Sequence, residues 1–111
     1  MARRRVLNSM KRLEIVLECA QLTAVRRLLD DHATGYTIVH DVTGYGHHGL
    51  REREMILVLT VVTREHFDPI VDALLPMLGD RSGVVMISDV EVLRGEHFVP
   101  ELRGRKLVHG I

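Results

Sequence analysis

Apolar and polar residues alternate along the first regular segment of the chain. After Lys11, Leu13, Ile15 and Leu17 occupy every second position, and this period predicts a β-strand with one buried face. Apolar residues of segment 22–29 then recur at intervals of three and four, which predicts an amphipathic helix with Thr23 as a candidate N-cap. Gly35 interrupts the helical pattern and predicts the start of the next strand.

The next two predicted strands are joined by a long, glycine-rich connection. Segment 36–42 is rich in aromatic and β-branched residues, and segment 55–62 is apolar enough to lie in the middle of a sheet. The connection between them, residues 43–54, holds three glycines and is far longer than a two-residue hairpin turn. Because a long loop costs conformational entropy without burying apolar surface, such a loop is typical of a functional segment.

A second helix and a fourth strand complete the regular part of the pattern. Asp68 and Pro69 suit the cap and the first position of a helix with an apolar face. Pro76 lacks an N–H group, so we expect a kink or an early end there. Residues 79–83 predict a turn, and segment 84–93 predicts a strand.

The order strand, helix, strand, strand, helix, strand predicts an α+β fold. Two such halves form the ferredoxin-like βαββαβ architecture, a four-stranded antiparallel sheet with both helices on one face. The central strands carry apolar residues on both sides, so we expect association with other copies to cover the helix-free face. Within this plan, residues 1–10 are a flexible basic leader, residues 11–98 form the domain, and residues 99–111 are a partly ordered C-terminal tail.

Composition narrows the class of protein. Of 111 residues, 46% are hydrophobic and 27% are charged, as in a soluble globular domain. The 15 basic residues balance the 15 acidic ones, so no overall cationic field attracts nucleic acid. No apolar run approaches membrane-spanning length, and the segment after the basic residues 3–5 is too short for a secretory signal. The single cysteine, Cys19, excludes an internal disulfide and indicates a cytoplasmic protein.

Short motifs resemble those of nitrogen regulatory PII signalling proteins. The run TGYTI at 34–38, followed by GYG at 44–46, resembles the T-G-x-T-V and G-F-G motifs of that family. Asp-Val at 89–90 falls on a last strand where PII proteins also carry Asp-Val. Ala33 before the first motif and Glu-Val-Leu at 91–93 look especially similar to the PII-like branch found with bicarbonate transporters and carboxysomes. The resemblance covers most of the predicted domain in element order.

The resemblance implies a homotrimer that binds an adenine nucleotide in each cleft between neighbouring subunits. The long loop after the second strand would then be an effector arm that contacts a partner protein. Glycines suit such a site because their backbone N–H groups can approach an anion closely, and arginines can add charge-assisted bonds to phosphate. The candidate nucleotide-binding residues are Gly35, Tyr36, Thr37, Gly44, Gly46, Thr60, Val61, Val62, Arg81, Gly83 and Arg94. The candidate effector-loop residues are Thr43, Tyr45, His47, His48 and Gly49.

Some positions depart from the PII pattern. His47 and His48 stand where PII proteins of nitrogen control carry Arg-Gln; that glutamine helps to hold magnesium and 2-oxoglutarate, so 2-oxoglutarate sensing is not expected. Residues 50–54 offer no counterpart of the modifiable tyrosine, so uridylylation is not expected. Val84 replaces the lysine that follows Gly83, and the lost positive charge favours ADP or AMP over ATP. A small anion such as bicarbonate would fit near the glycines of the loop.

Two other classes of function stay open. Imidazoles bind zinc, copper and nickel, so His47 and His48, with His40 nearby in the sequence, could make the chain a small trimeric metal-binding protein. An enzyme on the same fold is disfavoured, because Cys19 has no histidine at a local spacing and no catalytic set is complete.

The favoured hypothesis is a non-enzymatic PII-like signalling protein with no tightly bound cofactor. It would report energy or inorganic-carbon status to a transporter or enzyme of carbon or nitrogen assimilation. Ligand contacts would order the 43–54 loop and change its affinity for that partner.

Overall fold

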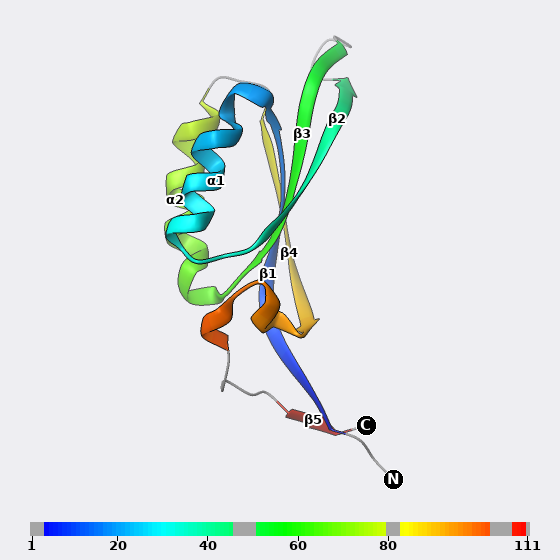
Figure 1. The fold of residues 1–111 in the computed structure, drawn as a ribbon, viewed down its shortest axis with the longest axis vertical. Helices are drawn as coiled ribbons and strands as arrows, with labels where there is room; N and C mark the ends of the chain where they lie inside the picture. Colours follow the sequence, from blue (N-terminus) through cyan, green and yellow to red (C-terminus); the bar gives the residue numbers. More distant parts are fainter. Residues whose placement is uncertain (1–3, 46–50, 80–82, 103–107, 111) are drawn as a thin grey trace.

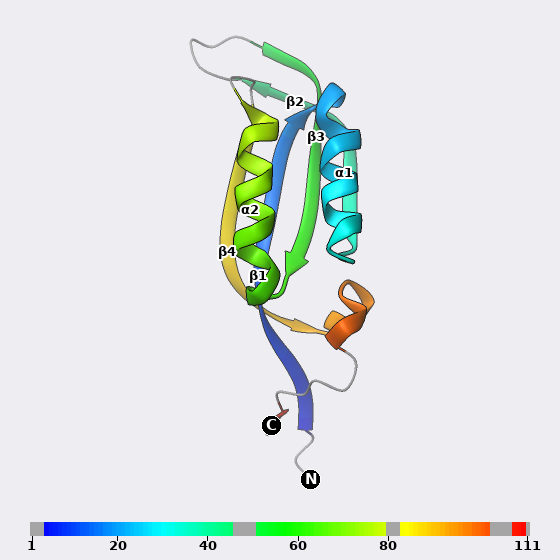
Figure 2. The same ribbon diagram turned by 90° about the vertical axis from the view of Figure 1, so that its left-hand side faces the viewer.

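The computed structural model describes residues 4–45, 51–79, 83–102 and 108–110. Two α-helices pack side by side on one face of a curved antiparallel sheet (Figures 1 and 2). The path β2-β3-β1-β4 makes the main sheet, and a short strand, β5, pairs with β1. This arrangement confirms the predicted ferredoxin-like sheet with both helices on one face. The main elements are β1 (Arg4–Glu18), α1 (Leu22–Asp31), β2 (Tyr36–Tyr45), β3 (Arg51–Val62), α2 (Arg64–Leu78), β4 (Val84–Leu93) and β5 (Val108–Gly110).

Strand register explains which side chains enter the core. Leu13 lies opposite Thr60 of β3 and Ile87 of β4, and residues directly opposite in an antiparallel pair share one face of the sheet. The alternating apolar residues of β1 therefore face the helices, as the sequence predicts. They pack with the apolar face of each helix in one cluster of buried residues: Leu13, Ile15, Leu17, Val25, Leu28, Leu29, Ile56, Val58, Val62, Ile70, Leu74 and Leu78.

The first helix begins at Leu22, the first residue of the predicted segment, but Thr23 is not its N-cap. The N-cap of α1 is Gln21, and Thr23 lies inside the helix. The buried Gln21 side chain accepts a hydrogen bond from the Glu18 N–H (2.9 Å) and donates one to the Met77 carbonyl (3.0 Å). Because this amide links the end of β1 to the end of α2, tertiary contacts rather than cap preference position the first turn.

The second helix begins earlier than Asp68 and Pro69 suggest. Its N-cap is Thr63, which has an extended backbone and whose carbonyl accepts a hydrogen bond from the N–H of His66 (3.1 Å). Pro69 therefore lies within the helix, where its ring removes one donor. Burial of the apolar face compensates, because packing of that face supplies most of a helix's stability. The helix also continues past Pro76 to Leu78, so the proline does not terminate it.

The N-terminal segment is more ordered than predicted, and parts of the C-terminal tail form regular structure. Strand β1 starts at Arg4 and residues 7–10 pair with β4, so the prediction of a flexible leader is wrong for residues 4–10. Within the predicted tail, residues 100–102 form a 3-10 turn, η4, and β5 pairs with residues 4–6. The sequence has no periodic signal in residues 4–6 or in β5, because both segments are short. Each becomes ordered by pairing with the other.

The predicted 43–54 loop is partly a β-hairpin. Thr43, Gly44 and Tyr45 belong to β2, and β3 already begins at Arg51, which lies opposite Tyr45. The β2–β3 register shifts on both sides of Val42. These shifts follow a left-handed residue, Asp41 (φ 58°), and aspartate tolerates that conformation better than most residues. The connection is therefore shorter than the sequence indicated.

The helix-free face of the sheet is largely apolar. Val39 of β2 and Val84 and Met86 of β4 are exposed by 41%, 54% and 48%. The register places them on the face of the sheet that points away from the helices. Such a surface is costly to leave in water. Neither helix in the described part of the chain is long and apolar enough to span a membrane.

Candidate functional site

Three segments that are distant in sequence meet at the end of the sheet where β3 finishes. Gly35, just before β2, donates its N–H to the Phe98 carbonyl (2.6 Å). The Gly35 carbonyl accepts a hydrogen bond from the Thr60 hydroxyl (2.7 Å). Two of the predicted nucleotide-binding residues therefore contact each other, and a residue that sequence reasoning left out of the site completes the group.

A shallow pocket of about 80 Å³ opens beside this contact. Its walls are mostly apolar, and Arg12 supplies a charged side chain, which pairs with Glu14 through Nη2 and Oε1 at 2.8 Å. Val61, another predicted residue, lies on the helix-free side and packs towards the C-terminal segment. The residues around the pocket are Arg12, Leu59, Thr60, Val61 and Phe98.

The neighbouring candidates point in different directions. The Tyr36 hydroxyl donates to Asp30 Oδ1 (3.0 Å) and accepts from Arg26 Nε (3.2 Å), so its side chain is directed at α1. The hydrogen bond from Arg26 to the Tyr36 hydroxyl raises the pKa of Arg26. Thr37 is exposed, whereas Val62 is fully buried in the main core. Among these three candidates, Thr37 offers an exposed surface position, while Tyr36 and Val62 hold the surrounding backbone in place.

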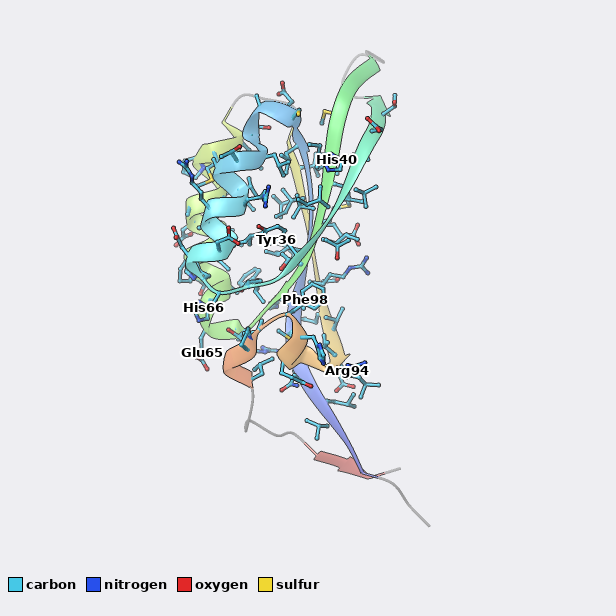
Figure 3. The ribbon with its side chains drawn as sticks, in the orientation of Figure 1. Tyr36, His40, Glu65, His66, Arg94 and Phe98 are labelled. Atoms are coloured by element: carbon cyan, nitrogen blue, oxygen red, sulfur yellow. The ribbon has the colours of Figure 1, made fainter. Side chains whose placement is uncertain are left out.

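Arg94 lies at the same end of the molecule, immediately after β4 (Figure 3). Its backbone is left-handed (φ 59°), and it precedes a 3-10 turn, η3 (Gly95–His97). Its guanidinium Nη2 donates to His97 Nε2 at 2.9 Å, and the side chain is exposed. A non-glycine residue in this conformation costs energy, so local packing holds the turn in place.

A second group of candidates lies at the opposite end of the sheet. Gly44 lies opposite Glu52 of β3, whereas Tyr36 lies opposite Thr60. Glu52 and Thr60 are eight positions apart, about 26 Å along an extended strand. Gly83 precedes β4, and a β-carbon added there would lie 2.6 Å from Leu78 Cδ2, at the end of α2. A single chain therefore does not bring all the predicted nucleotide-binding residues together.

Several candidates lie outside the described residues. These are Gly46, Arg81 and the effector-loop residues His47, His48 and Gly49. Within the described ranges, no group of three or more histidine, cysteine or acidic side chains could hold a metal ion. His40 is exposed on β2 and lies away from Phe98 and Arg94 (Figure 3).

Sequence reasoning missed Arg12, Leu59 and Phe98. Phe98 falls in a stretch without a clear period, so it gave no strand or helix signal. The apolar residues Phe98, Val99 and Leu102 do follow a local spacing of one and three, which in retrospect suits a single helical turn with one buried side. Arg12 lies next to a core residue on an alternating strand, a pattern that indicates the opposite face and gives no signal for a site.

The comparisons agree with the geometry. The family model for nitrogen regulatory protein P-II matches residues 10–97. CPII from Thiomonas intermedia K12, a nitrogen regulatory PII-like protein, is 36% identical, with 79% of this chain and 97% of that chain covered and a TM-score of 0.71. That structure holds ADP, AMP and bicarbonate, and another CPII structure holds ADP and bicarbonate. No curated protein sequence matches the chain.

A PII-like signalling protein of Thermus thermophilus is similar at 25% identity. The match covers 85% of this chain and 99% of that chain, with a TM-score of 0.68. A DUF3240-family protein of Shewanella baltica shares the fold at 8% identity and a TM-score of 0.63, with 73% of this chain and 89% of that chain covered. Because the family model matches most of the sequence and the fold agrees, the chain belongs to the nitrogen regulatory protein P-II family.

Proposed function

We propose that this protein is a PII-like regulator that binds ADP or AMP, together with bicarbonate, and thereby controls a partner protein. One observation carries the proposal: CPII, which is 36% identical over 79% of this chain, is bound to ADP, AMP and bicarbonate. The sequence motifs at Gly35 and Gly44 lie within the segment that the family model matches. Nucleotide and small-anion binding is therefore the chemistry to test first.

The split site supports a homotrimer with nucleotide between subunits. The group around Gly35 and Thr60 and the group around Gly44 and Gly83 lie at opposite ends of one chain. A second copy can place its Gly83 end beside the Gly35 end of the first, and this completes a site that neither copy holds alone. The same association would cover exposed Val84 and Met86, which explains the apolar helix-free face.

The chemistry of the Gly83 turn supports ADP or AMP rather than ATP. Val84 follows this glycine, so the position carries no positive charge for a third phosphate. Gly44 and Gly46 permit a close backbone approach, and consecutive N–H groups can hold an anion. We place bicarbonate at these glycines, beside the nucleotide phosphates.

The 43–54 segment would be the effector arm. Its strand portions project beyond the helix layer (Figure 1), so a partner can reach them without disturbing the core. Ligands at Gly44 would favour one conformation of the arm and change its affinity for a cytoplasmic partner. That partner would be a transporter or an enzyme of inorganic-carbon or nitrogen assimilation. The regulation needs no catalytic residue.

Calorimetric titration with ADP, AMP and ATP, with and without bicarbonate, tests the ligands. We expect ADP and AMP to bind more tightly than ATP, and bicarbonate to strengthen the binding, because coupling between two ligands is reciprocal. Gly44→Val should weaken ADP binding at least tenfold, whereas His40→Val, at an exposed position on the same strand, should leave it unchanged. Absence of binding by the unsubstituted protein would refute the function.

Sedimentation analysis tests the assembly. We expect a species of three times 12.6 kDa. A monomer that binds ADP with unchanged affinity at every protein concentration would contradict a site shared between subunits.

A further inference from the structure

A short C-terminal segment covers the Gly35 end of the candidate site. We call residues 94–102 the C-terminal cover; it comprises η3 and η4 and lies beside the lower part of the sheet, apart from the helix layer (Figures 1 and 2). Its buried residues Val99 and Leu102 pack with Met10 in a cluster separate from the main core. Because segments that pack in small separate clusters can open without global unfolding, the cover can detach while the sheet and helices persist.

Phe98 of the C-terminal cover accepts the hydrogen bond of the Gly35 N–H and also fills the space beside Gly35. The Gly35 N–H donates to the Phe98 carbonyl at 2.6 Å, and the Gly35 carbonyl accepts from the Thr60 hydroxyl. A β-carbon at Gly35 would come within 3.2 Å of Phe98 Cα and 3.3 Å of Phe98 Cδ1. A phosphate or ribose oxygen can therefore reach this N–H only after Phe98 moves away.

The space that a single chain leaves beside Phe98 is small. The pocket beside Phe98 measures about 80 Å³, whereas pockets for drug-sized ligands measure roughly 300–1,000 Å³. Phe98 forms part of its wall together with Thr60 and Val61. Removal of the Phe98 ring would enlarge the space on the side where Gly35 lies.

The junction between β4 and the cover carries backbone strain. Arg94 has φ 59°, a left-handed conformation that a residue with a β-carbon adopts at an energetic cost. This conformation turns the chain from β4 into η3. Release of the cover lets Arg94 relax, which lowers the free-energy difference between the docked and released states.

We infer that the C-terminal cover is a built-in competitor of the nucleotide: Phe98 docks on Gly35, and adenine nucleotide binds there only when the cover is released. The inference rests on the proposed nucleotide function and adds its regulation. Since only the released fraction binds, the apparent Kd equals the intrinsic Kd divided by the released fraction. Any partner that holds the released cover would raise the nucleotide affinity by the same linkage.

Calorimetric titration of ADP into matched variants tests the competition. Phe98→Ala removes the docked ring, and we expect it to tighten ADP binding about tenfold. Leu102→Ala weakens the anchoring of the cover, because Leu102 packs with Met10 and Val99, at a residue that does not line the pocket, and should tighten binding at least threefold. Leu75→Ala, on an exposed position of α2, should change nothing. Thermal melting verifies that each variant retains the main core.

The outcomes separate the competition from the nucleotide function. Tighter binding by both Phe98→Ala and Leu102→Ala supports the cover as a competitor. Weaker binding by Phe98→Ala would show that the ring is a wall of the occupied site, and unchanged binding would show that the cover is irrelevant; either overturns the inference and leaves the nucleotide function intact. If the unsubstituted protein and all variants fail to bind ADP, the proposed function fails, and the competition fails with it.

Discussion

Thr60, near the end of β3, contributes one hydrogen bond to the candidate site. Its hydroxyl donates to the Gly35 carbonyl at 2.7 Å, and the residue is 2% exposed. Thr60→Val keeps the shape of the side chain and removes the donor. The substitution therefore measures how strongly this bond holds Gly35 in position.

Two opposing contributions set the expected change in the free energy of unfolding for Thr60→Val. A buried carbonyl left without its partner costs about 1–3 kcal/mol, and the added methyl group returns about 0.8 kcal/mol through the hydrophobic effect. We therefore expect the free energy of unfolding to fall by about 1 kcal/mol. For a domain of this size, such a loss lowers the melting temperature by about 4 °C.

The assay is urea unfolding at a fixed protomer concentration, because the stability of an oligomer depends on concentration. Thr37→Val is the matched control: Thr37 lies on the neighbouring strand opposite Leu59, and it is exposed. We expect the control to change stability by less than about 0.5 kcal/mol, as is usual for surface substitutions. An unfolding midpoint for Thr60→Val equal to that of the unsubstituted protein, with an unchanged slope, would refute the importance of this bond.

Three further perturbations test other parts of the molecule. Gly83→Ala should destabilise the fold by about 1–3 kcal/mol, because its β-carbon would lie 2.6 Å from Leu78 Cδ2; thermal melting measures the loss. Lys11→Met should raise the pKa of Asp89, because the hydrogen bond and the charge of Lys11 lower it; NMR titration of the carboxyl group measures the change. Protease should cut the 43–54 segment more slowly in the presence of ADP and bicarbonate, if ligands order the effector arm.

The sign of the Asp89 effect follows from linkage. Since folding lowers the pKa of Asp89, its contribution to stability is present above the ordinary value of 3.8 and is lost as the pH falls through the folded value. Lys11→Met should weaken this dependence, because Lys11 is the main cause of the lowered pKa of Asp89. An unshifted Asp89 titration, a Gly83→Ala protein of full stability, or equal cleavage rates with and without ligand would contradict the respective expectation.

The local periodicity of apolar residues predicted most of the fold. Alternation over 13–17 and the three-and-four spacing over 22–29 record which face of each element is buried, and both segments pack in the main core as expected. Strand β4 has the predicted limits, Val84–Leu93. The helix caps were mispredicted: the N-cap of α1 is Gln21, whose buried amide contacts the Met77 carbonyl, and the N-cap of α2 is Thr63.

The candidate site was only partly readable from sequence. The family resemblance identified Gly35 and Thr60, and the structure brings these residues together. The motifs did not show that Gly44 and Gly83 lie at the other end of the chain's own sheet. That separation follows from strand register, which a linear spacing does not reveal.

The sequence by itself determined the βαββαβ order, the buried face of each regular element and the glycines of the family motifs, because these depend on residues that are neighbours along the chain. Only the tertiary structure decided that β5 pairs with the start of β1 and that Phe98 docks on Gly35. The segments in these contacts are short and lack a period of their own. They become ordered because the folded sheet holds their partners in place, so the information resides in the three-dimensional arrangement rather than in either segment alone.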